Sequence, residues 1–323
     1  GFLHHPAAPE TVFQGAKAAS YAGDLDTTEK LLESIRSTYP DKVKLGYELA
    51  LVQYNTGRFD QSRSTLLWTI AGGSRDARLY RLLAWTYQRQ DRATEAARTM
   101  MQAIDLNPST DAGYTELALI LIEQKRFTDA YEVAAKAVEK TPNSAAAHKV
   151  KGQAESYIGI LRQALGSFQR AVELDPTDQE ALLLMAQVQA NLRMVPEASA
   201  TFEKGIAKFP RNARFYEGYG RLLLQPTGKP DPVMESRGQI LLEKALALDN
   251  SLADAYYELG KLLLAKGRAQ EALPHLEASA KLKPANSQFH FTLAEAYRAL
   301  EREEDYRNTL EIYRKLQAEE NRN

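Results

Sequence analysis

The stretch ADAYYELGKLLLAKGRAQEALPHLEASAKLKPAN, Ala253 to Asn286, decides the fold. Apolar residues recur three and four positions apart on both sides of Gly267, a pattern typical of two amphipathic helices joined by a turn. The small residues Gly260 and Ala272 allow the two helix axes to approach closely. Pro284 ends the second helix, because proline cannot continue it. The stretch therefore predicts one helical hairpin.

The same pattern returns at a fixed interval along most of the chain. Prolines that follow an apolar run are separated by 68, 34, 34, 34 and 74 residues, at Pro40, Pro108, Pro142, Pro176, Pro210 and Pro284. A period of roughly 20 to 50 residues is the signature of a repeat solenoid. Small residues keep the same register, at Ala16, Ala50, Ala84, Ala118, Gly152, Ala186, Gly220, Gly260 and Ala294. The chain divides into nine rows: 9–42, 43–76, 77–110, 111–144, 145–178, 179–212, 213–252, 253–286 and 287–320.

The 34-residue period, the columns of small residues and the closing proline resemble the tetratricopeptide repeat family. The resemblance covers residues 9–320 and implies an all-α fold, a right-handed superhelical α-solenoid of nine tandem helix-turn-helix repeats. Some positions depart from the family pattern: Lys151 takes a usually apolar place, and Gly205 and Gly238 stand where alanine is usual. We expect a disordered segment over residues 1–8, a single solenoid over 9–320 and a tail over 321–323.

The row 213–252 has 40 residues and contains LLLQPTGKPDPVMESRGQ, Leu222 to Gln239, with three prolines close together. Neither a phosphate-binding loop nor a domain linker fits it, because the serine or threonine and the glycines of the first are missing and the repeat register continues after it. Instead, we expect an insertion of six residues between two helices of one repeat. Pro226 should end the first helix near Gln225, and Asp231 should cap the second, with Pro232 as its first residue. Whether residues 226–231 make a contact stays open.

The bulk composition argues against several classes of protein. The chain has 41 basic and 42 acidic residues, a net charge of −1, whereas proteins that bind nucleic acid usually carry a basic excess. It has no cysteine, which excludes disulfides, thiolate metal sites and cysteine nucleophiles. No apolar run approaches the roughly 18 residues of a membrane span. We therefore expect no nucleic-acid partner and no membrane span. A start at Gly1 leaves open a removed signal peptide or a further domain, and with it the compartment, cytoplasmic or periplasmic or secreted; the oligomeric state is also open.

The residues that could carry chemistry are few. The five histidines have no metal-ligand spacing, and His148 and His290 occupy a place that tyrosines hold in other rows, which favours a packing role. No phosphate-binding glycine pattern and no nucleophile elbow occur. The sequence therefore predicts no enzyme, no catalytic residue, no cofactor and no metal.

Partner binding is the remaining function, and the family resemblance implies its location. In this family the first helix of each repeat lines the concave surface, with exposed residues at the second, fifth, ninth, twelfth and thirteenth places of our rows. The predicted partner-binding residues are Tyr47, Leu51, Tyr54, Arg78, Arg81, Trp85, Arg89, Leu119 and Ile122. Tyrosine, tryptophan and arginine among aliphatics are typical of an interaction hot spot. As an alternative, Tyr47, Tyr54 and Tyr257 only pack between neighbouring first helices.

The leading hypothesis is a non-catalytic scaffold for protein–protein interaction that binds a peptide or protein segment in the concave groove. The carboxylate clamp of lysine and asparagine found in some co-chaperones of the family is not matched, because Lys149 is followed by Gln153, and Leu184 and Gly218 fill the next places. Two alternatives remain: an accessory module of a separate or cropped enzyme or secretion assembly, and single-stranded RNA binding, which the neutral charge supports less.

Overall fold

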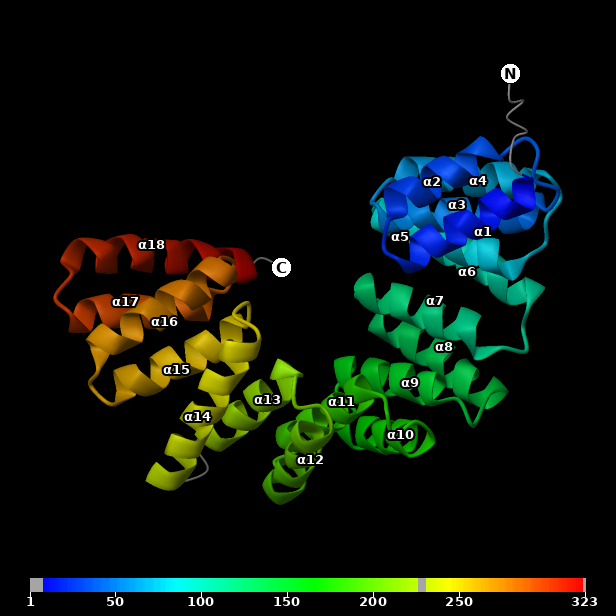
Figure 1. The fold of residues 1–323 in the computed structure, drawn as a ribbon. Helices are drawn as coiled ribbons and strands as arrows, with labels where there is room; N and C mark the ends of the chain where they lie inside the picture. Colours follow the sequence, from blue (N-terminus) through cyan, green and yellow to red (C-terminus); the bar gives the residue numbers. More distant parts are fainter. Residues whose placement is uncertain (1–7, 226–230, 322–323) are drawn as a thin grey trace. The chain divides into compact units, whose positions relative to one another are not determined.

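The computed structural model describes residues 8–225 and 231–321, and within these ranges the chain forms eighteen helices and no strand (Figure 1). They pair into nine hairpins, which confirms the predicted all-α repeat architecture. The helices are α1 (Pro9–Tyr21), α2 (Leu25–Ser34), α3 (Lys42–Asn55), α4 (Phe59–Ala71), α5 (Ala77–Arg89), α6 (Ala93–Leu106), α7 (Asp111–Glu123), α8 (Phe127–Lys140), α9 (Ala145–Tyr157), α10 (Leu161–Leu174), α11 (Gln179–Asn191), α12 (Val195–Lys208), α13 (Ala213–Leu224), α14 (Pro232–Leu248), α15 (Ala253–Ala265), α16 (Ala269–Leu282), α17 (Ser287–Ala299) and α18 (Glu303–Glu320).

The chain divides into two compact units, Gly1–Asp175 and Pro176–Asn323. Unit 1 contains α1 to α10 and unit 2 contains α11 to α18. A single solenoid over residues 9–320 stays a prediction. The expected disordered start falls mainly on residues 1–7, outside the described part of the chain, and of the expected tail only Asn321 is described, as the residue that follows α18.

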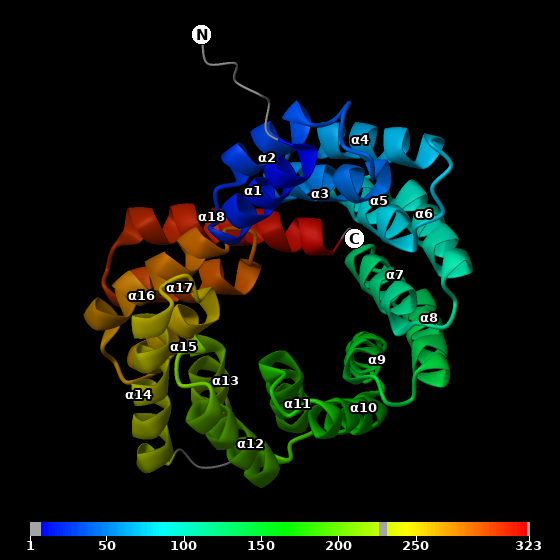
Figure 2. The same cartoon turned by 45° about the vertical axis from the view of Figure 1, so that its right-hand side comes forward.

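Within each unit the first helices of successive repeats contact one another. In unit 1 this row is α3, α5, α7 and α9, and in unit 2 it is α11, α13, α15 and α17. The second helices of unit 1 lie on the other side of this row, as α6, α8 and α10 do in Figure 2. A binding surface on one first helix can therefore continue onto the first helix of the next repeat.

Helix starts follow the predicted capping chemistry. The Asp41 carboxylate accepts a hydrogen bond from the Lys44 N–H at 2.9 Å, and the Ser144 hydroxyl accepts one from the Ala147 N–H at 3.1 Å. Both side chains satisfy backbone donors that have no partner inside the helix. A polar side chain shortly after the closing proline thus caps the next helix in α3, α9, α11, α13 and α17, whereas the Thr110 side chain makes no such bond at the start of α7.

Both packing histidines bond to the proline that closes the preceding repeat. The Nε2 atom of His148 lies 2.9 Å from the Pro142 carbonyl oxygen, and that of His290 lies 2.9 Å from the Pro284 oxygen. Since a carbonyl oxygen only accepts, each ring donates from Nε2. The Tyr216 hydroxyl donates in the same way to the oxygen of Pro210 at 3.2 Å. Histidine and tyrosine thus hold the same joint between repeats.

Wherever the structure describes the turn inside a hairpin, that turn uses a left-handed residue. Glycine supplies it in four repeats, at Gly23, Gly57, Gly159 and Gly267, with φ between 72° and 84°. Four other repeats place a non-glycine residue in the same conformation, at Asp91, Lys125, Arg193 and Glu301. For a residue with a Cβ atom, the left-handed conformation costs about 1 kcal/mol or more.

The departures from the small-residue pattern have a steric reason. A Cβ atom on Gly205 would lie 2.2 Å from the ring of Phe215, and one on Gly238 would lie 2.9 Å from the Leu224 side chain. At these two places the Phe215 and Leu224 side chains therefore fill the space that an alanine methyl group would need.

Lys151, at a usually apolar place, is part of a polar cluster between α9 and α10. Its Nζ atom bonds the Glu155 carboxylate and lies 3.3 Å from the Ser167 hydroxyl. Ser167 in turn donates to Glu155 at 2.6 Å, and the Glu155 side chain is fully buried. A buried carboxylate needs such partners, which explains the lysine.

The insertion in the row 213–252 has the predicted ends. Helix α13 ends at Leu224 with Gln225 as its C-cap, and α14 begins at Pro232. The Asp231 carboxylate caps α14 by accepting from the N–H groups of Val233 and Met234 at 2.9 and 3.3 Å. Helix α14 has 17 residues, three more than α12, so it starts about one turn early. Residues 226–230 lie outside the described part of the chain.

Candidate functional site

All nine predicted partner-binding residues lie on three consecutive first helices of unit 1. Helix α3 carries Tyr47, Leu51 and Tyr54; α5 carries Arg78, Arg81, Trp85 and Arg89; α7 carries Leu119 and Ile122. Arg78 and Arg89 are exposed, and the other seven are half-buried. Because α3 contacts α5 and α5 contacts α7, the three helices bring these side chains into neighbouring rows.

Arg78 is held at the start of α5 by Asp76 and Tyr47. Its Nε and Nη2 atoms donate to the Asp76 carboxylate at 2.7 to 3.1 Å, and this carboxylate also caps the helix through the Arg78 N–H at 2.9 Å. The Arg78 guanidinium lies 5.2 Å from the centre of the Tyr47 ring, a cation–π distance. The hydrogen-bonded Asp76 carboxylate raises the pKa of Arg78 above its ordinary value. This arginine therefore points in a defined direction.

Arg81 joins α5 to α7 through a paired contact with Glu116. Its Nε atom donates to Glu116 Oε2 at 2.8 Å, and its Nη2 atom bonds Oε1. The hydrogen-bonded Glu116 carboxylate raises the pKa of Arg81, so the guanidinium stays charged. Two parallel bonds fix the plane of the guanidinium as well as its position.

Tyr54 and Arg89 meet at Phe59, where the first helix of a repeat turns into the second. The Tyr54 and Phe59 rings lie 5.5 Å apart at 66°, edge to face. The Arg89 guanidinium lies 5.7 Å from the Phe59 ring centre. Burial raises the pKa of the Tyr54 hydroxyl above its ordinary value. Tyr54 thus packs within its unit, as the alternative interpretation expects, and still keeps part of its surface in solvent.

The apolar members of the set form the outer layer of the core. Tyr47, Leu51 and Tyr54 pack against a cluster that contains Leu79 and Leu83. The remaining three, Trp85, Leu119 and Ile122, cover two further clusters around Met100 and Val150. A half-buried ring on a well-packed base is the arrangement that gives hot spots their energy.

Tyr257 of unit 2 behaves as a packing residue. Its side chain is only 9% exposed, its ring stacks on Phe289 at 4.6 Å, and the Thr292 hydroxyl lies 3.3 Å from its own hydroxyl.

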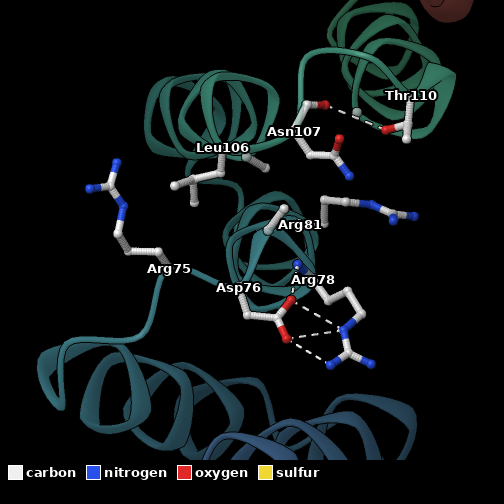
Figure 3. A pocket seen from close by; sticks show the side chains of 10 residues that line it. Arg75, Asp76, Arg78, Arg81, Leu106, Asn107 and Thr110 are labelled. Carbon is white, nitrogen blue, oxygen red and sulfur yellow. Dashed lines mark hydrogen bonds and ion pairs between the residues drawn. The ribbon is translucent and has the colours of Figure 1, made fainter.

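A hollow of about 340 Å³ adjoins the set at the N-terminal ends of α5 and α7 (Figure 3). The loop before α5 contributes Arg75 and Asp76, and the loop before α7 contributes Asn107 and Thr110. The hollow is also lined by Ala77, Arg78, Arg81, Ala103, Leu106 and Gly113. Figure 3 shows Arg75 on one side of the start of α5, with its guanidinium directed away from Arg78 and Arg81, which lie on the other side.

Sequence reasoning missed the loop residues of this hollow, because it counted only places on the first helices. Arg75 and Asn107 precede those helices, and no periodic pattern marks them. The available signal was the pair Arg78 and Arg81, since residues three apart on a helix lie near one another. Glu116 was also missed, although it lies 35 residues after its partner Arg81, about one repeat.

The described residues contain neither a candidate metal site nor a helix that could cross a membrane. No three histidine, cysteine, aspartate or glutamate side chains there are grouped so that they could hold a metal ion. In residues 8–225 and 231–321, no helix has the length and apolar character that crossing a membrane requires.

Family models match a large part of the chain. Models described as tetratricopeptide repeat match residues 47–99, 81–145 and 160–222, and a model described as bacterial transcriptional activator domain matches residues 229–320. Among curated proteins, Hsp70-Hsp90 organizing protein 1 of Glycine max is 21% identical over 140 residues, 43% of this chain and 24% of that protein. The human protein O-mannosyl-transferase TMTC3 is 25% identical over 199 residues, 60% of this chain and 21% of that protein. The human mitochondrial import receptor subunit TOM70 is 24% identical over 194 residues, 58% of this chain and 31% of that protein. The chain thus matches less than a third of the length of these relatives.

Solved structures share the fold over most of the chain. A tetratricopeptide repeat protein from Parabacteroides merdae superposes with a TM-score of 0.56 at 15% identity, over 89% of this chain and 98% of that one. A chain of the APC/C hetero-tetramer Cut9-Hcn1 superposes with a TM-score of 0.63 at 14% identity, over 96% of this chain and 61% of that one. At these identities the likeness concerns the fold alone.

Proposed function

The chain belongs to the tetratricopeptide repeat family, and on that premise we propose that it is a non-catalytic scaffold for protein–protein interaction. Its partner is a peptide or protein segment that lies along α3, α5 and α7 and contacts the nine residues named above. We call this set of nine the first-helix patch.

One observation carries the proposal. Three consecutive first helices, each in contact with the next, present half-buried tyrosine, tryptophan and aliphatic side chains beside arginines that are held in place by Asp76 and Glu116. Arginine that is fixed before binding loses little conformational freedom when a partner arrives, and aromatic rings supply large contact areas. The names of two relatives, an organizing protein for Hsp70 and Hsp90 and an import receptor, also favour a protein as partner.

The test compares a double variant in the patch with a matched control. A partner is recovered by crosslinking and affinity purification from the source cells, and its Kd is measured by calorimetry for the wild type and for Trp85→Ala/Arg81→Ala. We expect the double variant to bind more weakly by well over 1 kcal/mol, a loss of more than about five-fold.

The control uses a tryptophan–arginine pair on the other face of the same unit. Trp68 on α4 is 42% exposed, and the Arg36 guanidinium lies 4.9 Å from its ring centre. Trp68→Ala/Arg36→Ala removes the same side chains and should leave the Kd unchanged. If both double variants weaken the partner equally, or if neither does, the first-helix patch is not the binding site. Urea unfolding of each variant separates lost binding from lost folding, because Trp85 packs against the core.

A further inference from the structure

The hollow beside the first-helix patch has hydrogen-bond donors that the fold does not use. Arg78 and Arg81 each donate from Nε and Nη2 to a carboxylate. The Nη1 atom of either guanidinium makes no hydrogen bond to a described residue. Arg75 is exposed, and its guanidinium has no hydrogen bond or ion pair with any described residue. An arginine has five donors, so these three retain several in or beside one hollow.

The first-helix face of unit 1, at whose edge the hollow lies, is basic relative to the rest of the unit. The segment Gly1–Asp175 holds equal numbers of basic and acidic residues. At the five face positions of its first helices, however, basic residues outnumber acidic ones: Lys17, Lys44, Arg78, Arg81, Arg89 and Lys149 stand against Glu10 and Glu123. Glu48, Glu116 and Asp76 neutralise Lys17, Arg81 and Arg78, so an excess of one basic residue remains, and the exposed Arg75 adds to it. A surface of this charge attracts acidic partners and speeds their encounter.

The lining of the hollow combines apolar and polar groups that suit a carboxylate side chain. Leu106, Ala103 and the methylene stems of the arginines form its apolar wall, and Asn107 and Thr110 add polar groups at its edge (Figure 3). Glutamate carries two methylene groups and a planar carboxylate, the geometry that guanidinium groups bind through paired hydrogen bonds.

We propose that this hollow binds an aspartate or glutamate side chain of the partner segment, with Arg75 as its main uncompensated charge and Arg78 and Arg81 as the bridge to the first-helix patch. The proposal rests on the proposed function, and it adds that the partner is acidic where it passes the starts of α5 and α7. Arg75 is thereby a specificity-determining residue outside the patch itself.

The experiment uses the full chain and a peptide array. Each peptide combines leucine and alanine with glutamate, and a second version carries glutamine at every glutamate position. The best-binding pair is then labelled with a fluorophore, and its Kd values are measured by anisotropy for the wild type, Arg75→Ala, Arg162→Ala and Trp85→Ala. Arg162 is the matched control, because it is also an exposed arginine of unit 1 and lies on the second helix α10.

We expect Arg75→Ala to weaken binding of the glutamate peptide by about three- to ten-fold and to leave binding of the glutamine peptide unchanged, because the variant loses one solvent-accessible ion pair between Arg75 and the peptide carboxylate. Arg162→Ala should change neither. Equal losses for the two arginine variants would mean a general charge effect and would overturn the site.

Two further outcomes separate this inference from the proposed function. If glutamate and glutamine peptides bind equally and Trp85→Ala weakens both, the patch binds peptides and the carboxylate site is wrong. If no peptide binds, both fail. A single-stranded RNA that binds more tightly than the glutamate peptide, with Arg75→Ala weakening it, would assign the hollow to phosphate groups and overturn the acidic peptide.

Discussion

Gly205 on α12 and Gly166 on α10 both lie inside second helices, and replacing each by alanine adds the same methyl group in different surroundings. At Gly166 no atom outside its own helix lies within 4 Å of the position that Cβ would take. Alanine there only gains helix propensity, about 0.5 to 1 kcal/mol. We therefore expect Gly166→Ala to raise the free energy of unfolding by that amount.

At Gly205 the new Cβ would lie 2.2 Å from two ring atoms of Phe215 and 2.8 Å from a third. The Phe215 ring is fully buried and packs 6.0 Å from the Phe209 ring at 10°, so it has little room to move. Overpacking of this kind costs about 1 to 3 kcal/mol, and the propensity gain offsets part of it. The net expectation for Gly205→Ala is a loss of about 1 to 2 kcal/mol.

Urea unfolding of the full-length variants, followed by far-ultraviolet circular dichroism, measures both changes. Phe215→Leu provides the internal check, because a smaller side chain should make room for the methyl group. The double variant Gly205→Ala/Phe215→Leu should be more stable than the sum of the single changes implies, by at least about 0.5 kcal/mol. Should Gly205→Ala stabilise the chain as Gly166→Ala does, the steric reason given for glycine at this place is mistaken.

Three further changes test other parts of the structure. Arg193→Gly should raise the free energy of unfolding by about 0.5 to 1 kcal/mol, because residue 193 has a φ of 61° and its side chain is exposed; a thermal or urea titration that shows a loss would contradict the assigned turn. Lys151→Met should cost about 3 kcal/mol in a urea titration, because it leaves the buried Glu155 carboxylate with Ser167 alone, and the double variant Lys151→Met/Glu155→Met should recover part of the loss; no recovery would mean that the ion pair is not the cause. Burial lowers the pKa of His275 below its ordinary value, against a smaller opposite effect of Glu243, so the folded state binds this proton less readily than the unfolded one. The stability that neutral His275 contributes is complete above about pH 6.5 and falls as the pH drops from there towards the lowered pKa. The variant His275→Gln should therefore lose less stability on acidification than the wild type. Equal losses of stability in the two proteins would show that His275 is not a cause of the pH dependence.

The repeat period predicted the larger part of the fold because the residues that recur at this period are the ones that pack the helices together and end them. Small residues and closing prolines determine where helices approach and end, and the structure has a hairpin for each of the nine rows within the residues it describes. The cap at Asp231 was also predictable, because capping depends on a few neighbouring residues. The division after Asp175 was not, since the register of the rows passes through it unchanged.

The candidate site could be predicted only in part. Membership of α3, α5 and α7 follows from the row positions, and the structure brings these helices into contact, while the assignment of a partner to them stays a prediction. Arg75 and Asn107 escaped because loop conformation depends on local backbone geometry rather than on a period. The role of Lys151 escaped because it depends on Ser167, which reaches Glu155 from the second helix of the same hairpin.

The contacts that join one hairpin to the next have a mechanical consequence. Arg81 reaches Glu116, and His148 reaches Pro142, so each of these links ties a repeat only to its immediate neighbour. A chain built of such links should yield to a pulling force one hairpin at a time, because losing one repeat leaves the contacts of distant repeats intact. A segment bound across α3, α5 and α7 would act as a staple over three hairpins. In optical tweezers, the extension steps of those three hairpins should then merge into one larger step at higher force.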